Sequence, residues 1–148
     1  MKGVQVKHKA WLALILFLLP FTLFATPADD IKDLASVMNS MTAIWNKGDL
    51  KSFLSFYKND DSTIYVSSTI LAGYKNIAKR YTTHYPTKQS MGKLAISNLQ
   101  IKLLPPSYAM TIGNWKLERE GMSNAGGVFS VLCEKTSEGW KIIVDHTS

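Results

Sequence analysis

Cysteine and histidine are scarce in this chain, and the spacings that bind metals are absent. The 148 residues include one cysteine, Cys133, and three histidines. An intramolecular disulfide is therefore excluded. Because no His-x-His, His-x-x-x-His or paired-cysteine pattern occurs, we expect no metal site. Nucleotide-binding glycine loops and a nucleophile elbow are also missing, and we expect no cofactor. Cys133 follows two apolar residues, which indicates a buried structural position.

A hydrophobic run long enough to span a membrane is also lacking. The apolar stretch from Ala10 to Leu19 ends at Pro20 and is shorter than the roughly 20 residues of a spanning helix. Three lysines precede this stretch and small residues near Ala25 follow it, which is the layout of a secretory signal peptide. We therefore expect residues 1–25 to be cleaved off and the protein to be periplasmic or secreted, with no membrane attachment afterwards. A retained N-terminal anchor is the alternative.

The positive charge of the chain comes partly from this first segment. Seventeen Lys and Arg face eleven Asp and Glu, a net charge of +6. Without Lys2, Lys7 and Lys9, fourteen basic residues remain and the net charge is about +3. The local basic cluster of Lys75, Lys79 and Arg80 is interpreted as a solvated helix face, with phosphate contact as the alternative. No nucleic-acid motif is present, and we expect no nucleic-acid partner.

Helical periodicity dominates the first half of the remaining chain. Apolar residues recur at spacings of three and four between Asp29 and Lys47, which predicts an amphipathic helix with one buried face. Gly48 suits its end, and Asp49 suits the start of a short second helix that reaches Tyr57. A β-branched strand over Thr63–Ser68 and a third helix over 74–85 follow.

The second half has the alternation of strands. Four strands are predicted, over about 93–104, 108–120, 127–136 and 140–147. Their connectors are short or rich in turn residues, which favours antiparallel pairing. Helices that come first and a strand meander that comes later are typical of an α+β domain with helices on one face of a sheet.

Five sequence blocks, in this order, resemble the nuclear transport factor 2-like superfamily and most closely its SnoaL-like branch, known as domain of unknown function 4440. The blocks are Trp45–Leu50, Arg80-Tyr81 with Tyr85-Pro86, Met91–Leu94, Gly113–Leu117, and Gly139-Trp140 with Asp145–Ser148. They cover the segment from 29 to 148, which we predict as one SnoaL-like domain. The resemblance implies a cone-shaped, curved, mostly antiparallel sheet wrapped around N-terminal helices, a pocket at one end and a homodimer formed through the sheet. It implies no single activity.

The resemblance also allows the catalytic residues of one group of enzymes in the superfamily to be compared with this sequence. Ketosteroid isomerases use a carboxylate base, with a tyrosine and a protonated acid that stabilise the oxyanion. The tyrosine position falls on Met41, the base near Val66 or Ser67, and the second acid near Phe129 or Ser130. Since these functional groups are missing, we expect no isomerase chemistry of that kind.

The last strand carries the candidate for acid–base chemistry. Strict alternation would place His146 on the apolar face of Trp140, Ile142 and Val144, with Asp145 on the opposite face. His146 is therefore predicted as a pocket acid or base, and Asp145 as unable to orient it. Tyr65 or Ser67 would be its partner. A histidine that is merely hydrogen-bonded in the core is the alternative.

The remaining pocket candidates are mostly aromatic. We predict a ligand pocket lined by Trp45, Tyr65, Ser67, Tyr81, Trp115 and Phe129, which suits a small apolar or planar ligand with one polar end. Filling of the core by these rings is the alternative. Two functions follow: a small-molecule-binding protein with cofactor-free proton transfer, or a non-catalytic dimerisation or protein-interaction module. A cavity of about 300 Å³ or more favours the first function, and a filled cone favours the second.

Overall fold

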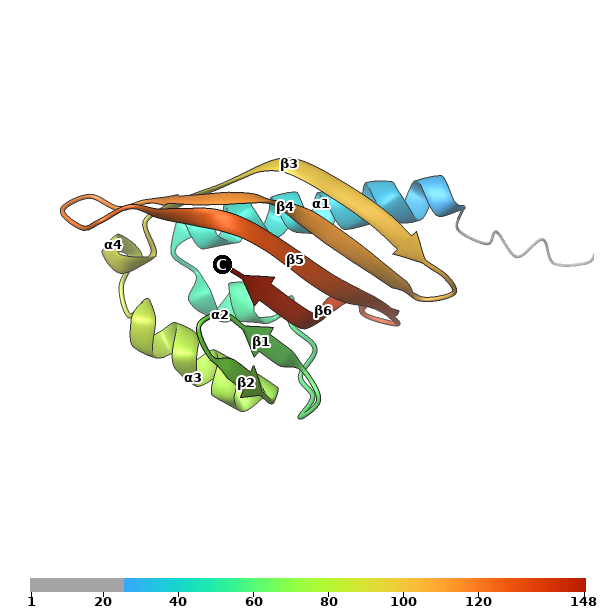
Figure 1. The fold of residues 1–148 in the computed structure, drawn as a ribbon, viewed down its shortest axis with the longest axis horizontal. Coiled ribbons are helices and arrows are strands. Elements are labelled where there is room, and N and C mark those ends of the chain that lie inside the picture. The colour runs from blue at the N-terminus through green and yellow to red at the C-terminus, as the bar shows by residue number, and fades with distance from the viewer. Residues whose placement is uncertain (1–25) are drawn as a thin grey trace, which may run out of the picture.

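The computed structural model describes residues 26–148, so the predicted signal peptide lies outside the described residues. Ten elements follow one another (Figure 1): α1 (Pro27–Lys47), α2 (Leu50–Leu54), β1 (Ile64–Val66), β2 (Ile70–Ala72), α3 (Tyr74–His84), α4 (Lys88–Met91), β3 (Lys93–Leu104), β4 (Tyr108–Glu118), β5 (Ala125–Thr136) and β6 (Gly139–Thr147). Among residues 26–148, no helix combines the length and the apolar character that crossing a membrane requires.

The long helix α1 forms because both of its ends are capped and one face is apolar. The Thr26 side chain and the Asp29 backbone and side chain form a capping box, and Pro27 occupies the first turn. Gly48 ends the helix with φ at 81°, a left-handed conformation that glycine adopts without a steric penalty. The buried residues Leu34, Met38, Met41 and Trp45 repeat at the predicted spacing.

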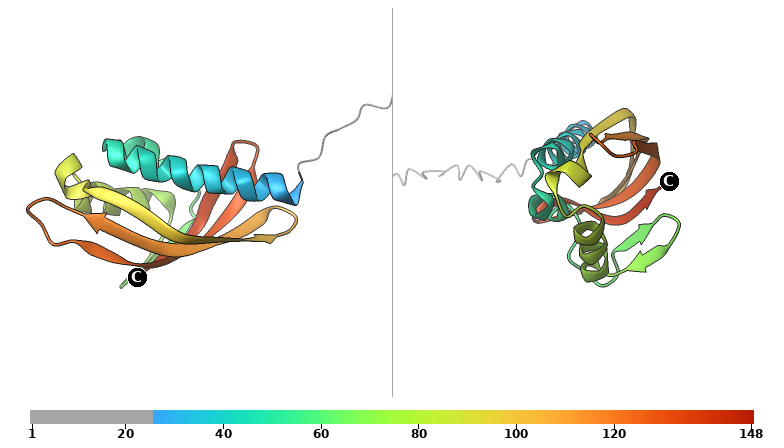
Figure 2. Two further views of the ribbon diagram at one scale, coloured as in Figure 1. Left: turned by 90° about the horizontal axis from the view of Figure 1, so that it is seen from above. Right: turned by 90° about the vertical axis from the view of Figure 1, so that its left-hand side faces the viewer.

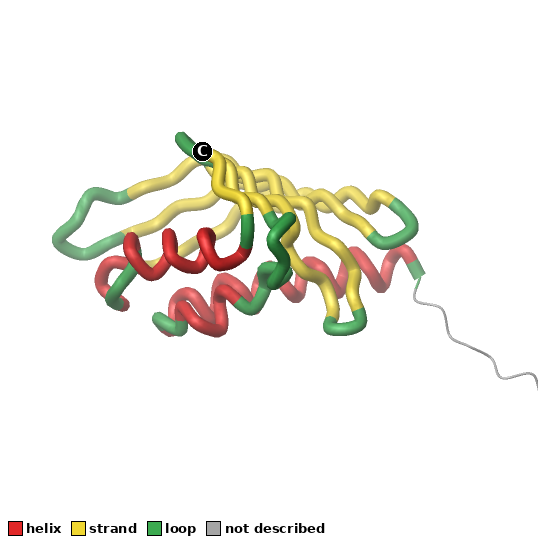
Figure 3. Tube along the Cα trace, turned by 90° about the horizontal axis from the view of Figure 1, so that it is seen from below, coloured by secondary structure: helices red, strands yellow, loops and turns green. Residues whose placement is uncertain are grey.

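The strands form one curved six-stranded sheet in the order β2-β1-β6-β5-β4-β3. The β1–β6 pair is parallel and every other pair is antiparallel. Helix α1 runs along the long strands and packs on β3 (Figure 2), and the helices lie on one side of the sheet (Figure 3). The predicted α+β class with a curved, mostly antiparallel sheet around N-terminal helices is confirmed.

Two short elements escaped the sequence-based prediction. Strand β2 has three residues and helix α4 has four, lengths too short for a period to show. β2 turns back on β1 as an antiparallel partner. α4 begins at a capping box between Thr87 and Ser90.

A bulge in β6 reverses the side chains at the end of that strand. Ile142 pairs with Cys133 and Val144 pairs with Leu132, so Ile143 is an extra residue with no partner on β5. Trp140 and Ile142 face the core before the bulge, and Asp145 faces it afterwards. His146 is exposed on the outer face of the sheet. The predicted inward orientation of His146 is therefore wrong, because one inserted residue exchanges the two faces of a strand.

Candidate functional site

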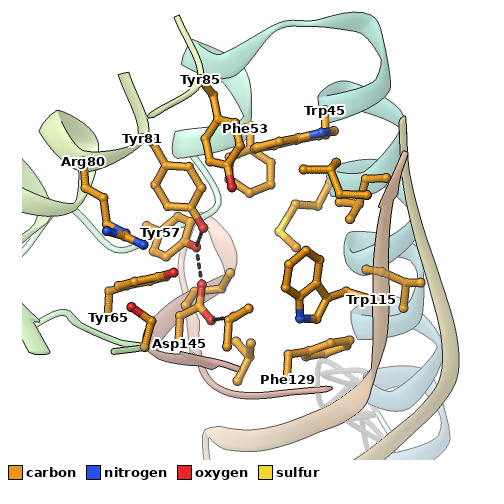
Figure 4. Close-up of a pocket in the computed structure, with 18 of the residues that line it drawn as sticks. Trp45, Phe53, Tyr57, Tyr65, Arg80, Tyr81, Tyr85, Trp115, Phe129 and Asp145 are labelled. Carbon is orange, nitrogen blue, oxygen red and sulfur yellow. Dashed lines mark hydrogen bonds between the residues drawn. The ribbon is translucent and has the colours of Figure 1, made fainter. Parts of the chain in front are cut away.

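A cavity of about 350 Å³ lies between the helices and the inner face of the sheet. All six side chains predicted for the pocket line it, namely Trp45, Tyr65, Ser67, Tyr81, Trp115 and Phe129. Figure 4 shows the aromatic ones around one space, with Trp45 and Trp115 on the side away from Arg80. His146 does not line this cavity. The cone is thus not filled by its own side chains.

Trp45 is held in place from two directions. Its Nε1 donates a hydrogen bond to the Met91 carbonyl oxygen at 3.0 Å, which ties the end of α1 to α4. Its ring packs edge-to-face on Phe53 and Tyr85, with both pairs of centroids 4.8 Å apart. Such aromatic pairs have a preferred geometry, so these contacts fix the orientation of the Trp45 ring.

Trp115 and Phe129 close the cavity on the sheet side. The Trp115 Nε1 donates to the Ser148 carbonyl oxygen at 3.2 Å. Phe129 packs against Gly113, where an added Cβ would lie 2.8 Å from the Phe129 ring. A glycine is therefore required at residue 113 for this ring to pack this closely against β4.

A buried network of oxygens lies at the base of the cavity. Asp145 is 5% exposed, and its two carboxylate oxygens accept separate hydrogen bonds. The Tyr57 hydroxyl donates a short bond to Oδ2, and the Thr147 hydroxyl donates to Oδ1 at 2.7 Å. The Tyr81 hydroxyl lies 2.8 Å from that of Tyr57 (Figure 4). Three chain segments therefore converge on one carboxyl group.

The direction of these bonds follows from counting protons. Burial raises the pKa of Asp145, and the hydroxyls of Tyr57 and Thr147 oppose that rise by stabilising the carboxylate. Burial and the Asp145 charge raise the pKa of Tyr57 and Tyr81 well above 10.0, so both stay protonated. When Asp145 is ionised, Tyr57 donates to it and Tyr81 donates to Tyr57. Both tyrosine protons are then used within the network.

Arg80 is the cationic residue of the cavity lining. Its guanidinium carbon lies 4.9 Å from the centroid of the Tyr65 ring, a cation–π contact. The predicted solvated face holds for Lys75 and Lys79, which are exposed, but not for Arg80, which is half-buried. Successive helix residues are about 100° apart, so Arg80 can lie beside the buried face that carries Ile77 and Tyr81.

Metal binding and thiol chemistry find little support in the described part of the chain. No cluster of three or more His, Cys, Asp or Glu residues that could hold a metal occurs within residues 26–148. Cys133 is buried, as predicted, and burial raises the pKa of its thiol to about 12. The thiolate that would react is therefore nearly absent at neutral pH.

Sequence reasoning missed Tyr57, Tyr85 and Thr147, and it excluded Asp145 from the pocket. The sequence predicts Tyr57 only as the end of a short helix. Strict alternation places Asp145, and with it Thr147 two residues on, on the wrong face. No local signal marks the bulge at Ile143, because its neighbours are equally apolar on both sides.

The fold and its pocket define the class of protein: an α+β cone whose sheet encloses a cavity against a long helix. Comparison with solved structures agrees with this class. A nuclear transport factor 2-like protein of unknown function from Shewanella oneidensis is similar, with 31% identity, a TM-score of 0.72, and coverage of 82% of this chain and 98% of that chain. The chain therefore belongs to the nuclear transport factor 2-like superfamily.

More distant structures share the fold alone. A superfamily protein from Salmonella enterica has 17% identity, a TM-score of 0.68, and coverage of 83% of this chain and 92% of that chain. A domain of unknown function with a cystatin-like fold from Nostoc punctiforme has 18% identity, a TM-score of 0.65, and coverage of 82% and 77%. No protein-family model and no curated protein sequence matches the chain. The SnoaL-like branch stays a prediction.

Proposed function

We propose that this protein binds a small, largely apolar molecule in the cavity between the helices and the sheet. The observation that carries the proposal is the volume of about 350 Å³, left open by side chains that otherwise pack tightly. Aromatic walls supply apolar contact, and the base of the cavity carries a few polar groups. A pure dimerisation or interaction module has no use for such a space, which weighs against that alternative.

Proton transfer without a cofactor is the chemistry that this cavity supports best. The acid–base group that we propose is Asp145, in place of His146, because Asp145 lines the cavity and His146 is exposed on the other face. A buried carboxyl with a raised pKa holds and releases a proton nearer to neutral pH than an exposed one. Tyr57 and Thr147 orient it.

We further propose that the protein is periplasmic or secreted and forms a homodimer through the outer face of the sheet. The basic and apolar character of residues 1–25 supports the first point. On the outer face, Ile112 is 45% exposed and Val128 is 53% exposed. Sedimentation tests the dimer: Ile112→Lys should dissociate it, whereas Ile70→Lys on the edge strand β2 should not.

A cavity-filling substitution tests ligand binding. Ile96 lines the cavity, and Ile96→Phe should abolish heat from titration with 2-naphthylmethanol, an apolar probe of two rings. Ile101→Phe adds the same volume on the same strand away from the cavity lining and should retain binding. Native mass spectrometry of the purified protein should also show a small co-purified mass. Equal binding by both variants would contradict the proposal.

A further inference from the structure

Polar groups gather at one end of the cavity, and most of them are hydrogen-bond donors. Arg80 and Tyr65 lie together on the side of α3 and β1 (Figure 4), and Ser67, which follows β1, lines the same cavity. Ser67 Oγ is hidden from solvent and has no hydrogen-bond partner within residues 26–148. The ion pairs of the described chain leave Arg80 out. This end of the cavity thus carries a charge without a counterion.

The count of hydrogen-bond donors and acceptors at this end favours a ligand that accepts hydrogen bonds. A guanidinium has five N–H donors and no acceptor, and the hydroxyls of Ser67 and Tyr65 each add one donor and can also accept. Asp145, the carboxylate of the lining, already accepts from Tyr57 and Thr147 and takes part in none of the ion pairs within residues 26–148. A ligand oxygen at the Arg80 end therefore meets donors from all three side chains, whereas a ligand N–H group there can be accepted only by the two hydroxyl oxygens and faces the guanidinium charge.

The charge at this end is a single positive one. Lys75 and Lys79 are exposed on the solvent side of α3, so among residues 26–148 only Arg80 contributes a positive charge to the cavity lining. One half-buried guanidinium balances a monoanion, whereas a phosphate dianion would leave one negative charge uncompensated in apolar surroundings. The Tyr65 ring beneath the guanidinium orients its planar fork, which suits the planar oxygens of a carboxylate.

We propose that the ligand is the anion of a small aromatic or branched aliphatic monocarboxylic acid. Its carboxylate contacts Arg80, with Ser67 and Tyr65 as further donors. Its apolar body lies toward Trp115 and Phe129 at the other end of the cavity. This inference rests on the proposed function, since it names the ligand class of the same site.

Two matched probes test the inference by isothermal titration calorimetry. 2-Naphthoate and 2-naphthylmethanol share the apolar body and differ in the carboxylate. The wild-type protein should bind naphthoate about tenfold more tightly or better, the effect of one charge-assisted hydrogen-bond pair. Arg80→Gln should reduce the preference to about one, Arg80→Lys should keep part of it, and the neighbouring Lys79→Gln should leave it unchanged.

The outcomes separate this inference from the proposed function. Binding of both probes with equal affinity by the wild-type protein would overturn the carboxylate assignment and leave ligand binding standing. Failure of both probes to bind would count against the cavity as a binding site. A preference for naphthoate that survives in folded Arg80→Gln would assign the carboxylate to another cation and overturn the role of Arg80. The preference of the wild-type protein for naphthoate is measured without any variant. It therefore tests the carboxylate assignment even if Arg80→Gln fails to fold.

Discussion

The hydroxyl group of Tyr57 provides the sharpest test of the buried network. Tyr57 is 3% exposed, and its hydroxyl both donates to Asp145 and lies in hydrogen-bond distance of Tyr81. Tyr57→Phe removes one oxygen and keeps the ring, which packs against Phe53 with the centroids 6.1 Å apart. The substitution therefore leaves the apolar packing in place and removes the central link of the oxygen chain.

The expected loss of stability depends on the charge of Asp145. A hydrogen bond to a charged group contributes about 1.5–3 kcal/mol, and one between neutral groups about 0.5–1.5 kcal/mol. With Asp145 ionised, the variant should lose about 2–3 kcal/mol of unfolding free energy. With Asp145 protonated, it should lose about 1 kcal/mol. The Tyr81 hydroxyl adds to the loss only if it finds no new partner.

The pH dependence has a definite sign. The folded-state pKa of Asp145 is raised, so the folded protein binds this proton more tightly than the unfolded chain does. The contribution of Asp145 to stability therefore falls as pH rises from about 4 through its folded-state pKa. Tyr57→Phe removes a donor that opposes the raised pKa, which extends the fall to higher pH. The difference between wild type and variant should grow as pH increases.

Urea unfolding at several pH values, followed by tryptophan fluorescence, measures this difference. Tyr108→Phe is the control, because Tyr108 is 41% exposed and its loss should change stability by less than about 0.5 kcal/mol. In an Asp145→Asn background, the effect of Tyr57→Phe should no longer vary with pH. A loss of stability that is the same at every pH in the wild-type background would refute the reasoning.

Three further outcomes follow from the geometry. Gly113→Ala should cost about 1–3 kcal/mol of stability in urea unfolding, because the added Cβ meets the Phe129 ring at 2.8 Å. A second substitution, Phe129→Leu in the same chain, should recover part of this loss, and no recovery would contradict the contact. His146→Ala should leave the affinity for 2-naphthylmethanol unchanged in calorimetry, since His146 is outside the cavity lining. A marked loss of affinity would show that His146 contributes to the binding site. Cys133 should resist iodoacetamide in the folded protein and react in urea; fast native labelling would show that it is accessible.

Much of the fold was predictable because it depends on local patterns. The apolar period of α1, its end at Gly48 and the order of the long strands are visible in the sequence, and the structure confirms them. The aromatic lining of the cavity was predictable as well, because Trp45 follows the helical period of α1, and Trp115 and Phe129 follow the alternation of β4 and β5.

The polar base of the cavity was not predictable in this way. Tyr57 and Asp145 are 88 residues apart, and their contact depends on how the segment after α2 pairs with β6. The bulge at Ile143 decides that Asp145, and not His146, faces inward. A bulge is set by the pairing of two strands, so the isolated strand sequence carries no sign of it.

The sequence by itself determined the long helices and strands, the end of α1 at Gly48 and the aromatic rings that face inward, since these follow from local propensity and periodicity. Only the tertiary structure decided the chemistry of the pocket. The extra residue in β6 turns the Asp145 carboxyl group, and not the His146 imidazole, toward the cavity. Packing of α3 against β1 turns Arg80 from solvent toward the cavity. Both results depend on contacts between distant segments, where a one-residue shift changes which side chain meets the ligand.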